Sequence, residues 1–391
     1  MTNVSDNYNL ALGICGRDSK LTTKYGDAVE SLTIEGYKVM CGFFPAKFPN
    51  FDSTGKHSRS VLLRNRAFSC NYRDKAIILR MANMPLNKSF YPIGSEFCAT
   101  VMEVGKDVRD LNVGDRVMIN SYYASGERPW GIPTNHASRL VQIIPSSKLM
   151  KVPDAMTDEE AASFSIGGQT SFSMVRRTEI TRGTKVLVTG GSSNTSLFLM
   201  ASARRAGGDV YATTTSSHKI DALIKAGSNR VYVVDPEHGG IQYNEEIIDF
   251  CRDSGGFDVV LDPFADLYLA QAVHVMAVWG RYISCGVERQ FPPAGSGLSL
   301  SSDQPLLDAD GFFAVMTKNL NIIGNCIGST EDLENALDAW SNGELPVAID
   351  SVFSSEDAAG NGELICRGAA EFLSRTYLDS DRIGKVVYRY M

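Results

Sequence analysis

The chain has 391 residues, of which 43% are hydrophobic and 21% charged, a composition that excludes an intrinsically disordered protein. Its net charge of −7, with no cluster of lysines and arginines longer than a pair, argues against a nucleic-acid partner. No apolar run reaches the roughly 18 residues of a membrane span, and no secretory leader is visible, so no membrane partner and a cytoplasmic location are expected. The length predicts two domains.

The first 155 residues divide into a polar segment and a β-rich segment. Residues 1–30 are rich in Asp, Asn, Ser and Thr, and we expect them to form an irregular N-terminal extension. From about residue 36, short apolar or alternating runs are separated by Gly, Pro, Asn and Asp, which is typical of successive strands. These runs are YKVMCGFF, SVLLRNRAF, FCATVMEVG, DRVMIN and RLVQII. Their spacing predicts a small barrel or sandwich.

The pattern changes after Pro153, where Thr157 and Glu160 form a capping box ahead of a predicted helix. Strands and helices then alternate, which predicts a doubly wound parallel sheet. The predicted strands are KVLVTG (185–190), DVYATT (209–214), RVYVVD (230–235), FDVVLD (257–262), RYISCGV (281–287) and LNIIGNCIG (320–328). The predicted helices are SLFLMASARRAGG, KIDALIKAG, YNEEIIDFCRDSGG, LAQAVHVMAVWG and TEDLENALDAW, and GKVVYRY is a closing strand.

This order of elements, with several local motifs, resembles the medium-chain dehydrogenase/reductase superfamily. The motifs are SCNYRD (69–74), IGSEFCATVMEVG (93–105), LNVGDRVM (111–118), GGQTSF (167–172), DVVLDPF (258–264) and GRYISCGV (280–287). The resemblance covers about residues 35–391 and implies an α/β fold, with a GroES-like β-barrel catalytic domain and a Rossmann domain with a doubly wound parallel sheet. The implied parts are an N-terminal extension (1–30), a GroES-like catalytic domain (31–156 and 344–391) and a nucleotide-binding domain (157–343).

Zinc-dependent members of the superfamily use a Cys, a His followed by Glu, and a further Cys or Asp. The corresponding positions here hold Asn71, Ser95 and about Ile166, and only Glu96 is kept. The segment 121–138, where a structural zinc would bind, contains no cysteine. Because a zinc site needs four ligands, or three and an open position, no metal is predicted. The resemblance therefore narrows to zinc-independent quinone oxidoreductases and enoyl reductases.

The segment TGGSSNTSLF (189–198) lies where the family has its glycine-rich phosphate loop. One glycine is kept, whereas the second and third are replaced by Ser193 and Ser196. The following helix N-terminus still offers unpaired N–H groups and a partial positive charge to a phosphate. The alternative is that these residues only cap a helix in a protein that has lost its cofactor. The residues expected to bind the phosphates are Gly190, Ser192, Ser193, Asn194 and Thr195.

The second predicted strand ends without the acidic residue that binds the ribose of NAD. Instead Thr214, Ser216 and Lys219 supply hydrogen-bond donors and one cation, which suits a 2′-phosphate, so NADPH is the predicted cofactor. The resemblance implies three further cofactor contacts. They are Thr170 near the nicotinamide, the main chain of Cys285, Gly286 and Val287 at the carboxamide, and Lys385 beside the cofactor.

The resemblance also implies that Asn71, Tyr72 and Asp74 line the catalytic cleft. Tyr72 is the candidate proton donor or hydrogen-bond donor to the substrate carbonyl, and the alternative is a purely packing role. Asp74 is expected to orient its neighbours, and His136 is a second candidate acid.

The predicted reaction is hydride transfer from NADPH to the β-carbon of an activated C=C bond, followed by protonation at the α-carbon. The substrate is a small molecule, and a biosynthetic tailoring role would fit. One alternative is a carbonyl or imine reductase on the same scaffold. Another, motivated by the altered glycine loop, is a cofactor-binding protein without turnover. A homodimer is expected.

Overall fold

The chain forms two compact units in the computed structural model. One unit contains residues 1–165, 290–299 and 349–391, and the other contains residues 166–289 and 300–348. The domain limits predicted at 156/157 and 343/344 remain a prediction. Parts of segments 1–30 and 121–138 lie outside the described residues, which are 8–16, 28–84, 89–122, 136–288, 290–291, 299–300, 306–358 and 363–391.

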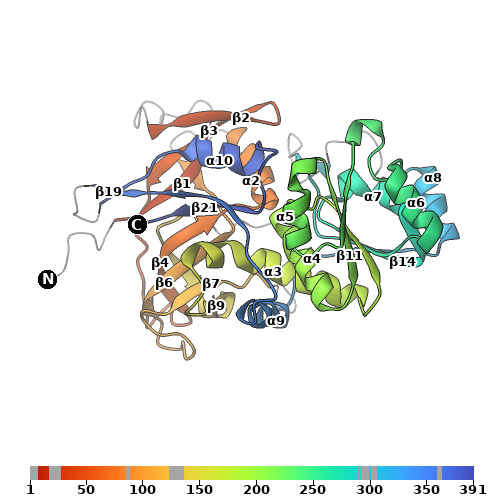
Figure 1. Ribbon diagram of the computed structural model, residues 1–391. Helices are drawn as coiled ribbons and strands as arrows, with labels where there is room; N and C mark the ends of the chain where they lie inside the picture. The colour runs from red at the N-terminus through yellow and green to blue at the C-terminus, as the bar shows by residue number, and fades with distance from the viewer. Residues whose placement is uncertain are drawn as a thin grey trace. The chain divides into compact units, whose positions relative to one another are not determined.

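The first unit is built mainly from antiparallel strands, as predicted (Figure 1). One sheet has the order β2-β3-β1-β5, and a larger one has the order β18-β21-β4-β6-β7-β9, with β8 paired to β4. The strands are β1 (Leu10–Cys15), β2 (Glu30–Ile34), β3 (Tyr37–Pro45), β4 (Ser60–Ser69), β5 (Phe90–Pro92), β6 (Glu96–Val104), β7 (Arg116–Ile119), β8 (Val141–Pro145), β9 (Leu149–Lys151), β18 (Ile349–Ser354) and β21 (Lys385–Arg389). Short pairs are β15 (Gln290–Phe291) with β16 (Ser299–Leu300) and β19 (Glu356–Ala358) with β20 (Glu363–Ile365).

The expectation of an irregular N-terminal extension was wrong for Leu10–Cys15. All six residues of this strand are buried, and β1 pairs antiparallel with both β3 and β5. The strand forms because its short apolar run LALGIC fills the centre of the four-stranded sheet. Because polar residues flank this run on both sides, the sequence analysis did not identify it as a strand.

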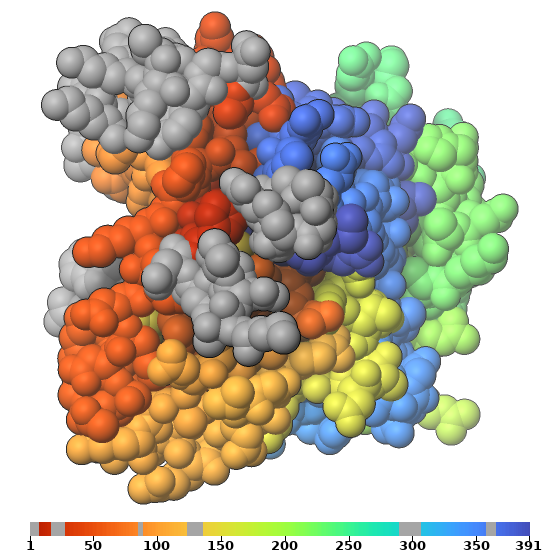
Figure 2. Space-filling model, turned by 90° about the vertical axis from the view of Figure 1, so that its left-hand side faces the viewer, coloured from red at the N-terminus to blue at the C-terminus, as the bar shows by residue number. Residues whose placement is uncertain are grey.

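Distant parts of the chain meet in this unit. Strand β21 pairs with β4, and α10 (Ala369–Tyr377) packs on β2 and β3, so the blue C-terminal segments adjoin the red and orange N-terminal ones in Figure 2. Phe68 contacts the rings of Phe372 and Tyr388 at centroid distances of 5.5 Å each. Helix α2 (Tyr72–Ala82), which the sequence analysis did not predict, directly follows β4.

The second unit has a six-stranded parallel sheet of order β12-β11-β10-β13-β14-β17, which confirms the predicted doubly wound sheet. Its strands are β10 (Lys185–Val188), β11 (Asp209–Thr214), β12 (Arg230–Val233), β13 (Phe257–Asp262), β14 (Met276–Ser284) and β17 (Asn321–Gly324). Its helices are α4 (Asn194–Arg205), α5 (Ile220–Lys225), α6 (Glu245–Ser254), α7 (Ala265–Val275), α8 (Ala309–Thr317) and α9 (Thr330–Ser341), and α3 (Asp158–Thr178) passes from one unit to the other. Among the described residues, no helix is long and apolar enough to cross a membrane.

The helix predicted over LAQAVHVMAVWG ends earlier than expected. Helix α7 stops at Val275, and Met276 already pairs with Phe257 as the first residue of β14. The register then shifts before Arg281, and Trp279 adopts a φ of +64° within the irregular part. Pairing with β13 therefore overrides the helical pattern of this segment.

Candidate active site

The predicted phosphate loop, residues 189–198, follows β10 and lies against the end of β11. The N–H of Gly191 donates to the carbonyl of Thr213 at 2.8 Å, and Gly190 has a φ of +54°. A Cβ on Gly191 would come within 2.8 Å of the Leu223 side chain and 2.9 Å of the Thr213 carbonyl oxygen. Only glycine fits there, so the close backbone approach that a dinucleotide loop requires is kept. The sequence analysis did not include Gly191 among the site residues.

The serines of this loop hold the start of α4. The Ser193 hydroxyl accepts the N–H of Ser196 at 3.1 Å, and the Ser196 hydroxyl donates to the carbonyl of Thr189 at 2.7 Å. The Ser193 hydroxyl is therefore already used as a helix cap. The first turn of α4 contains no acidic residue, so the positive end of the helix dipole is not neutralised by its own side chains.

The loops after β10 and β11 are joined by a side-chain contact between two predicted cofactor residues. The buried Lys219 extends its Nζ to within 3.3 Å of the Ser192 hydroxyl. Thr214 is buried, and its hydroxyl accepts the N–H of Ser216 at 3.2 Å, which shapes the turn that leads to Lys219. The structure thus brings Ser192, Thr214, Ser216 and Lys219 together at the carboxyl edge of adjacent strands.

The other predicted cofactor residues of this unit belong to neighbouring elements. The N–H of Cys285 donates to the carbonyl of Asp262 at 3.2 Å, and the carbonyl of Gly286 accepts the N–H of Ala265 at 2.9 Å, so segment 285–287 lies beside the end of β13. Burial raises the pKa of the Cys285 thiol to about 12, which makes it an unreactive thiol. Thr170 is buried on α3. One turn earlier on the same helix, a Cβ on Gly167 would come within 2.5 Å of the Phe198 side chain, so α3 and α4 pack closely there.

A buried carboxyl that the sequence analysis missed links three strands at the same edge. Asp262 accepts hydrogen bonds from the Thr189 hydroxyl at 2.5 Å, from the Tyr282 hydroxyl and from the N–H of Phe264 at 2.7 Å. Its side chain is fully buried, and this desolvation raises its pKa to about 6 in spite of the three donors. Asp262 therefore connects β10, β13 and β14 where the predicted cofactor residues lie.

This raised pKa makes a prediction about stability against pH. In the unfolded chain the carboxyl of Asp262 has a pKa of about 3.9. Between about pH 4 and pH 6 this carboxyl is therefore more protonated in the folded state than in the unfolded state, so the free energy of unfolding falls as pH rises. Between about pH 4 and pH 6 the free energy of unfolding is expected to fall by about 2–3 kcal/mol because of this one carboxyl. Urea unfolding near pH 4 and near pH 7 measures this loss as a difference between variants. The change in stability between these pH values is expected to differ between the wild type and Asp262→Asn by about this amount, because the titration of Asp74 and of the other carboxyls is common to both. The exposed-site control Asp253→Asn is expected to follow the wild type, and a pH dependence in Asp262→Asn equal to that of the wild type would contradict the assignment.

The barrel unit contains two of the predicted catalytic residues, Asn71 and Asp74, in one polar cluster. Lys385 Nζ lies 2.5 Å from Asn71 Oδ1 and 2.7 Å from Glu96 Oε2, and the side chains of Lys385 and Glu96 are 3% and 0% exposed. The Asn71 amide donates to Glu96 Oε2 at 2.7 Å and to the Ser95 hydroxyl at 2.9 Å. Lys385, predicted from the resemblance as a cofactor contact, is thus engaged with Asn71 and Glu96.

Asp74 is a structural member of this cluster. One carboxylate oxygen accepts the N–H of Asn71 at 2.7 Å and the Ser95 hydroxyl at 2.5 Å, which fixes the first turn of α2. Complete burial raises the pKa of Asp74 above its usual value. This arrangement agrees with the orienting role expected for Asp74.

Tyr72 occupies the first helical position of α2. Its ring meets that of Tyr377 edge-on at 6.2 Å, and the Lys75 ammonium lies 5.1 Å from its centroid. Tyr377 in turn donates its hydroxyl to the carbonyl of Asn71 at 3.1 Å. For His136, burial lowers the pKa to about 4, so the imidazole is neutral near pH 7 and is unsuited to the role of a protonated acid.

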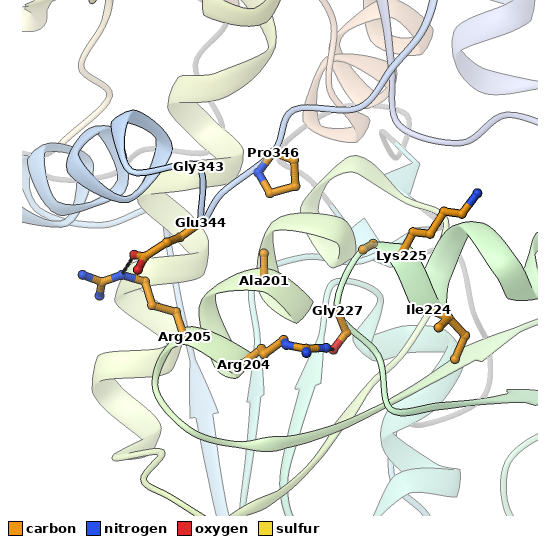
Figure 3. A pocket seen from close by; sticks show the side chains of 10 residues that line it. Ala201, Arg204, Arg205, Ile224, Lys225, Gly227, Gly343, Glu344 and Pro346 are labelled. Atoms are coloured by element: carbon orange, nitrogen blue, oxygen red, sulfur yellow. Dashed lines mark hydrogen bonds and ion pairs between the residues drawn. The ribbon is translucent and has the colours of Figure 1, made fainter.

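Figure 3 shows a different feature of the second unit, a groove at the opposite end of α4 from the phosphate loop. Arg204 donates to the carbonyl of Gly227 at 3.5 Å, and Arg205 pairs with Glu344 at 2.7 Å. Lys225 at the end of α5 also lines the groove. A helix of this length places the groove about 18 Å from the N-terminus of α4, so it is not part of the cofactor site.

The strand order of the parallel sheet and the glycine loop that follows its first strand define a fold of the Rossmann class. Residues 57–154 match the alcohol dehydrogenase GroES-like domain family, and residues 195–342 match the zinc-binding dehydrogenase family. The chain belongs to the medium-chain dehydrogenase/reductase superfamily. It is therefore an oxidoreductase of a family whose members bind a nicotinamide cofactor and act on small molecules.

Curated relatives are similar in part of their sequence, and solved structures are similar in fold. The chain is 30% identical over 231 residues to a polyketide synthase of Streptomyces halstedii and 26% identical over 233 residues to squalestatin hexaketide synthase of Phoma sp.. These matches cover 58% and 59% of this chain but only 4% and 9% of those relatives. The fold is similar to an alcohol dehydrogenase of Pyrobaculum aerophilum (TM-score 0.68, 19% identity, 97% and 99% of the chains). It is also similar to the quinone oxidoreductase of Coxiella burnetii (TM-score 0.63, 18% identity, 89% and 94%).

Proposed function

We propose that the protein is a zinc-independent, NADPH-dependent reductase of an activated C=C bond, of the enoyl-thioester or quinone type, with a biosynthetic tailoring role. The observation that carries the proposal is the Lys385 ammonium between Asn71 and Glu96. By the resemblance, Asn71 stands at the position of one metal ligand of zinc-dependent relatives, and Glu96 follows Ser95, which stands at the position of another. An ammonium bonded to these oxygens competes with a divalent cation for them. In addition, the described residues contain no group of three or more His, Cys, Asp or Glu that could hold a metal.

The polyketide synthase relatives support the enoyl-reductase form of the reaction. The matched stretch is a small part of those proteins, which is consistent with a match to a single reductase domain within them. A carbonyl or imine reductase on the same scaffold is the alternative. The eight cysteines are free thiols, which supports the proposed cytoplasmic location.

Several residues fit the cofactor. Gly191 and the N-terminus of α4 would receive the pyrophosphate, and Lys219 with Ser192 would receive the 2′-phosphate. When bound, NADPH supplies the hydride that is added to the β-carbon. Tyr72 would deliver the proton to the α-carbon, or hydrogen-bond the carbonyl that activates the alkene. Lys385, bonded to Asn71 Oδ1 and to Glu96, would hold the Asn71 side chain in a fixed position.

The cofactor proposal predicts a selective effect at Lys219. Lys219→Met removes the one cation of this loop, and a charge-assisted hydrogen bond is worth about 1.5–3 kcal/mol, so NADPH binding is expected to weaken about 10- to 100-fold. NADH lacks the 2′-phosphate, so the dissociation constant for NADH is expected to change by less than about threefold. Fluorescence titration with both nucleotides measures this.

Lys225→Met, at the far groove, serves as the matched control and is expected to bind both nucleotides like the wild type. An equal loss for NADPH and NADH in Lys219→Met would refute a 2′-phosphate contact. No fluorescence change with either nucleotide in the wild type would instead favour the alternative of a protein that has lost its cofactor, in which the serines only cap α4.

A further inference from the structure

Helix α2 buries three consecutive charged side chains, Arg73, Asp74 and Lys75. Lys75 pairs with Glu35 at 3.1 Å, and Asp74 is bonded within the polar cluster described above. Arg73 is 9% exposed, and its Nε is buried without a hydrogen-bond partner. Among the described residues, none accepts a hydrogen bond from the Arg73 guanidinium or forms an ion pair with it. The sequence analysis gave this residue no role.

The other buried cations in the described ranges each have a bonded partner. Lys219 lies 3.3 Å from the Ser192 hydroxyl, and Lys385 and Lys75 form ion pairs with glutamates. Arg73 therefore differs from all of them. Burying a charge without a bonded counter-charge is costly, so the described part of the chain leaves Arg73 in need of a partner that it does not supply.

Asp74, the next residue along α2, does not take this place. Complete burial raises the pKa of Asp74, and the charge of Arg73 acts in the opposite direction, so the two charges are near each other. They form no ion pair, however, because Asp74 Oδ1 and Arg73 Nε are both buried without a partner. Successive side chains on a helix point about 100° apart, which explains why the carboxyl is bonded inside the cluster and the guanidinium is not.

The guanidinium is closed at Nε and accessible at its end. Its terminal nitrogens also have no partner among the described residues, but unlike Nε they are not completely covered. Two such nitrogens side by side match the two oxygens of a carboxylate. A carboxylate carries one negative charge, which one guanidinium balances, whereas a phosphate group carries about two. The neighbouring ammonium groups of Lys75 and Lys385 are already paired with Glu35 and Glu96, so they add no cation for a phosphate.

We propose that Arg73 binds a free carboxylate of the substrate, which is then the enoyl thioester of a dicarboxylic acid. Arg73 follows Tyr72 directly on α2, in the segment for which the resemblance implies the catalytic cleft. The proposal rests on the proposed reductase function and adds the charge of the substrate to it. Arg73 is a specificity-determining residue in this account. It contacts a part of the substrate that does not react, so it acts mainly on KM.

The test compares two enoyl thioesters of N-acetylcysteamine, whose thiol part is uncharged. One ends in a free carboxylate and the other in the corresponding methyl ester, each prepared with several chain lengths. At the best chain length the wild type is expected to prefer the carboxylate about 10- to 100-fold in kcat/KM, mainly through KM. In Arg73→Met the preference is expected to fall below about threefold. Arg73→Lys is expected to be intermediate, since an ammonium keeps the charge but loses the paired N–H groups.

Arg80→Met is the matched control, because Arg80 is an exposed arginine on the same helix, and it is expected to keep the preference of the wild type. A fluorescence titration with NADPH shows that Arg73→Met is folded and is expected to give the dissociation constant of the wild type. Equal weakening of NADPH and NADH binding would assign Arg73 to the pyrophosphate of the cofactor and overturn the proposal. Equal use of the acid and the methyl ester by the wild type would also overturn it.

Binding of the saturated carboxylate thioester, measured by calorimetry, separates this proposal from the proposed reaction, because the saturated compound cannot be reduced. The wild type is expected to bind it at least about 10-fold more tightly than Arg73→Met does. If that difference is found but no thioester is reduced, the carboxylate site stands and the reaction is refuted. If thioesters are reduced but the saturated compound binds equally to both proteins, the reaction stands and the carboxylate site is refuted.

Discussion

Replacing Lys385 with methionine is expected to lower the free energy of unfolding by about 3–5 kcal/mol, because Glu96 would be left as a buried charge without its partner. The two side chains are 3% and 0% exposed, so water cannot take over the role of the ammonium. Urea unfolding of the wild type and the variant measures the loss. The expected catalytic effect is a fall in kcat/KM of about 100-fold or more.

Two further variants separate charge burial from function. In Lys385→Met/Glu96→Met both charges are removed, and most of the lost stability is expected to return while activity remains low. Lys75→Met is the matched control, since Lys75 is buried but its partner Glu35, at 3.1 Å, is 35% exposed and can turn to water. It is expected to cost less than about 1.5 kcal/mol. If the double variant recovered full activity, Lys385 would have only a structural role.

Replacing Tyr72 with phenylalanine is expected to lower kcat/KM about 100- to 1,000-fold while NADPH binding is unchanged. The ring would keep its contacts with Tyr377 and Lys75, so the loss would report on the hydroxyl alone. Steady-state kinetics with an enoyl thioester measures it, together with a fluorescence titration of NADPH.

Tyr377→Phe is the control for this prediction. Its hydroxyl donates to the carbonyl of Asn71 and positions the start of α2, so a smaller loss of about tenfold is expected. A kcat/KM in Tyr72→Phe equal to that of the wild type would leave Tyr72 as a packing residue and require a different proton donor.

The fold could be predicted largely from sequence because its signals are local. Predominantly apolar, β-branched strands such as KVLV and FDVVLD, each followed by a helix, indicated the parallel sheet. The errors arose where long-range pairing decides the structure. Leu10–Cys15 becomes a strand between β3 and β5, and Met276 leaves the helical pattern to pair with Phe257.

The candidate site was less accessible from sequence for the same reason. The ammonium of Lys385 meets Asn71 and Glu96 across 314 and 289 residues of chain, and no local pattern signals such a contact. The resemblance implied Asn71 as a residue of the catalytic cleft and Lys385 as a cofactor contact, and it did not indicate that the two side chains meet. The buried links of Asp262 were also missed, since an aspartate at the end of a strand is common and its burial depends on Thr189 and Tyr282.

The most direct test of the account is NADPH oxidation by chelator-treated protein with a short enoyl thioester, with zinc measured in the same sample. We predict consumption of NADPH at substoichiometric zinc, with deuterium from 4,4-dideuterated NADPH recovered on the β-carbon of the saturated product. Activity that appears only on addition of zinc would contradict the account, as would protein that binds NADPH but transfers no deuterium to enoyl thioesters or quinones.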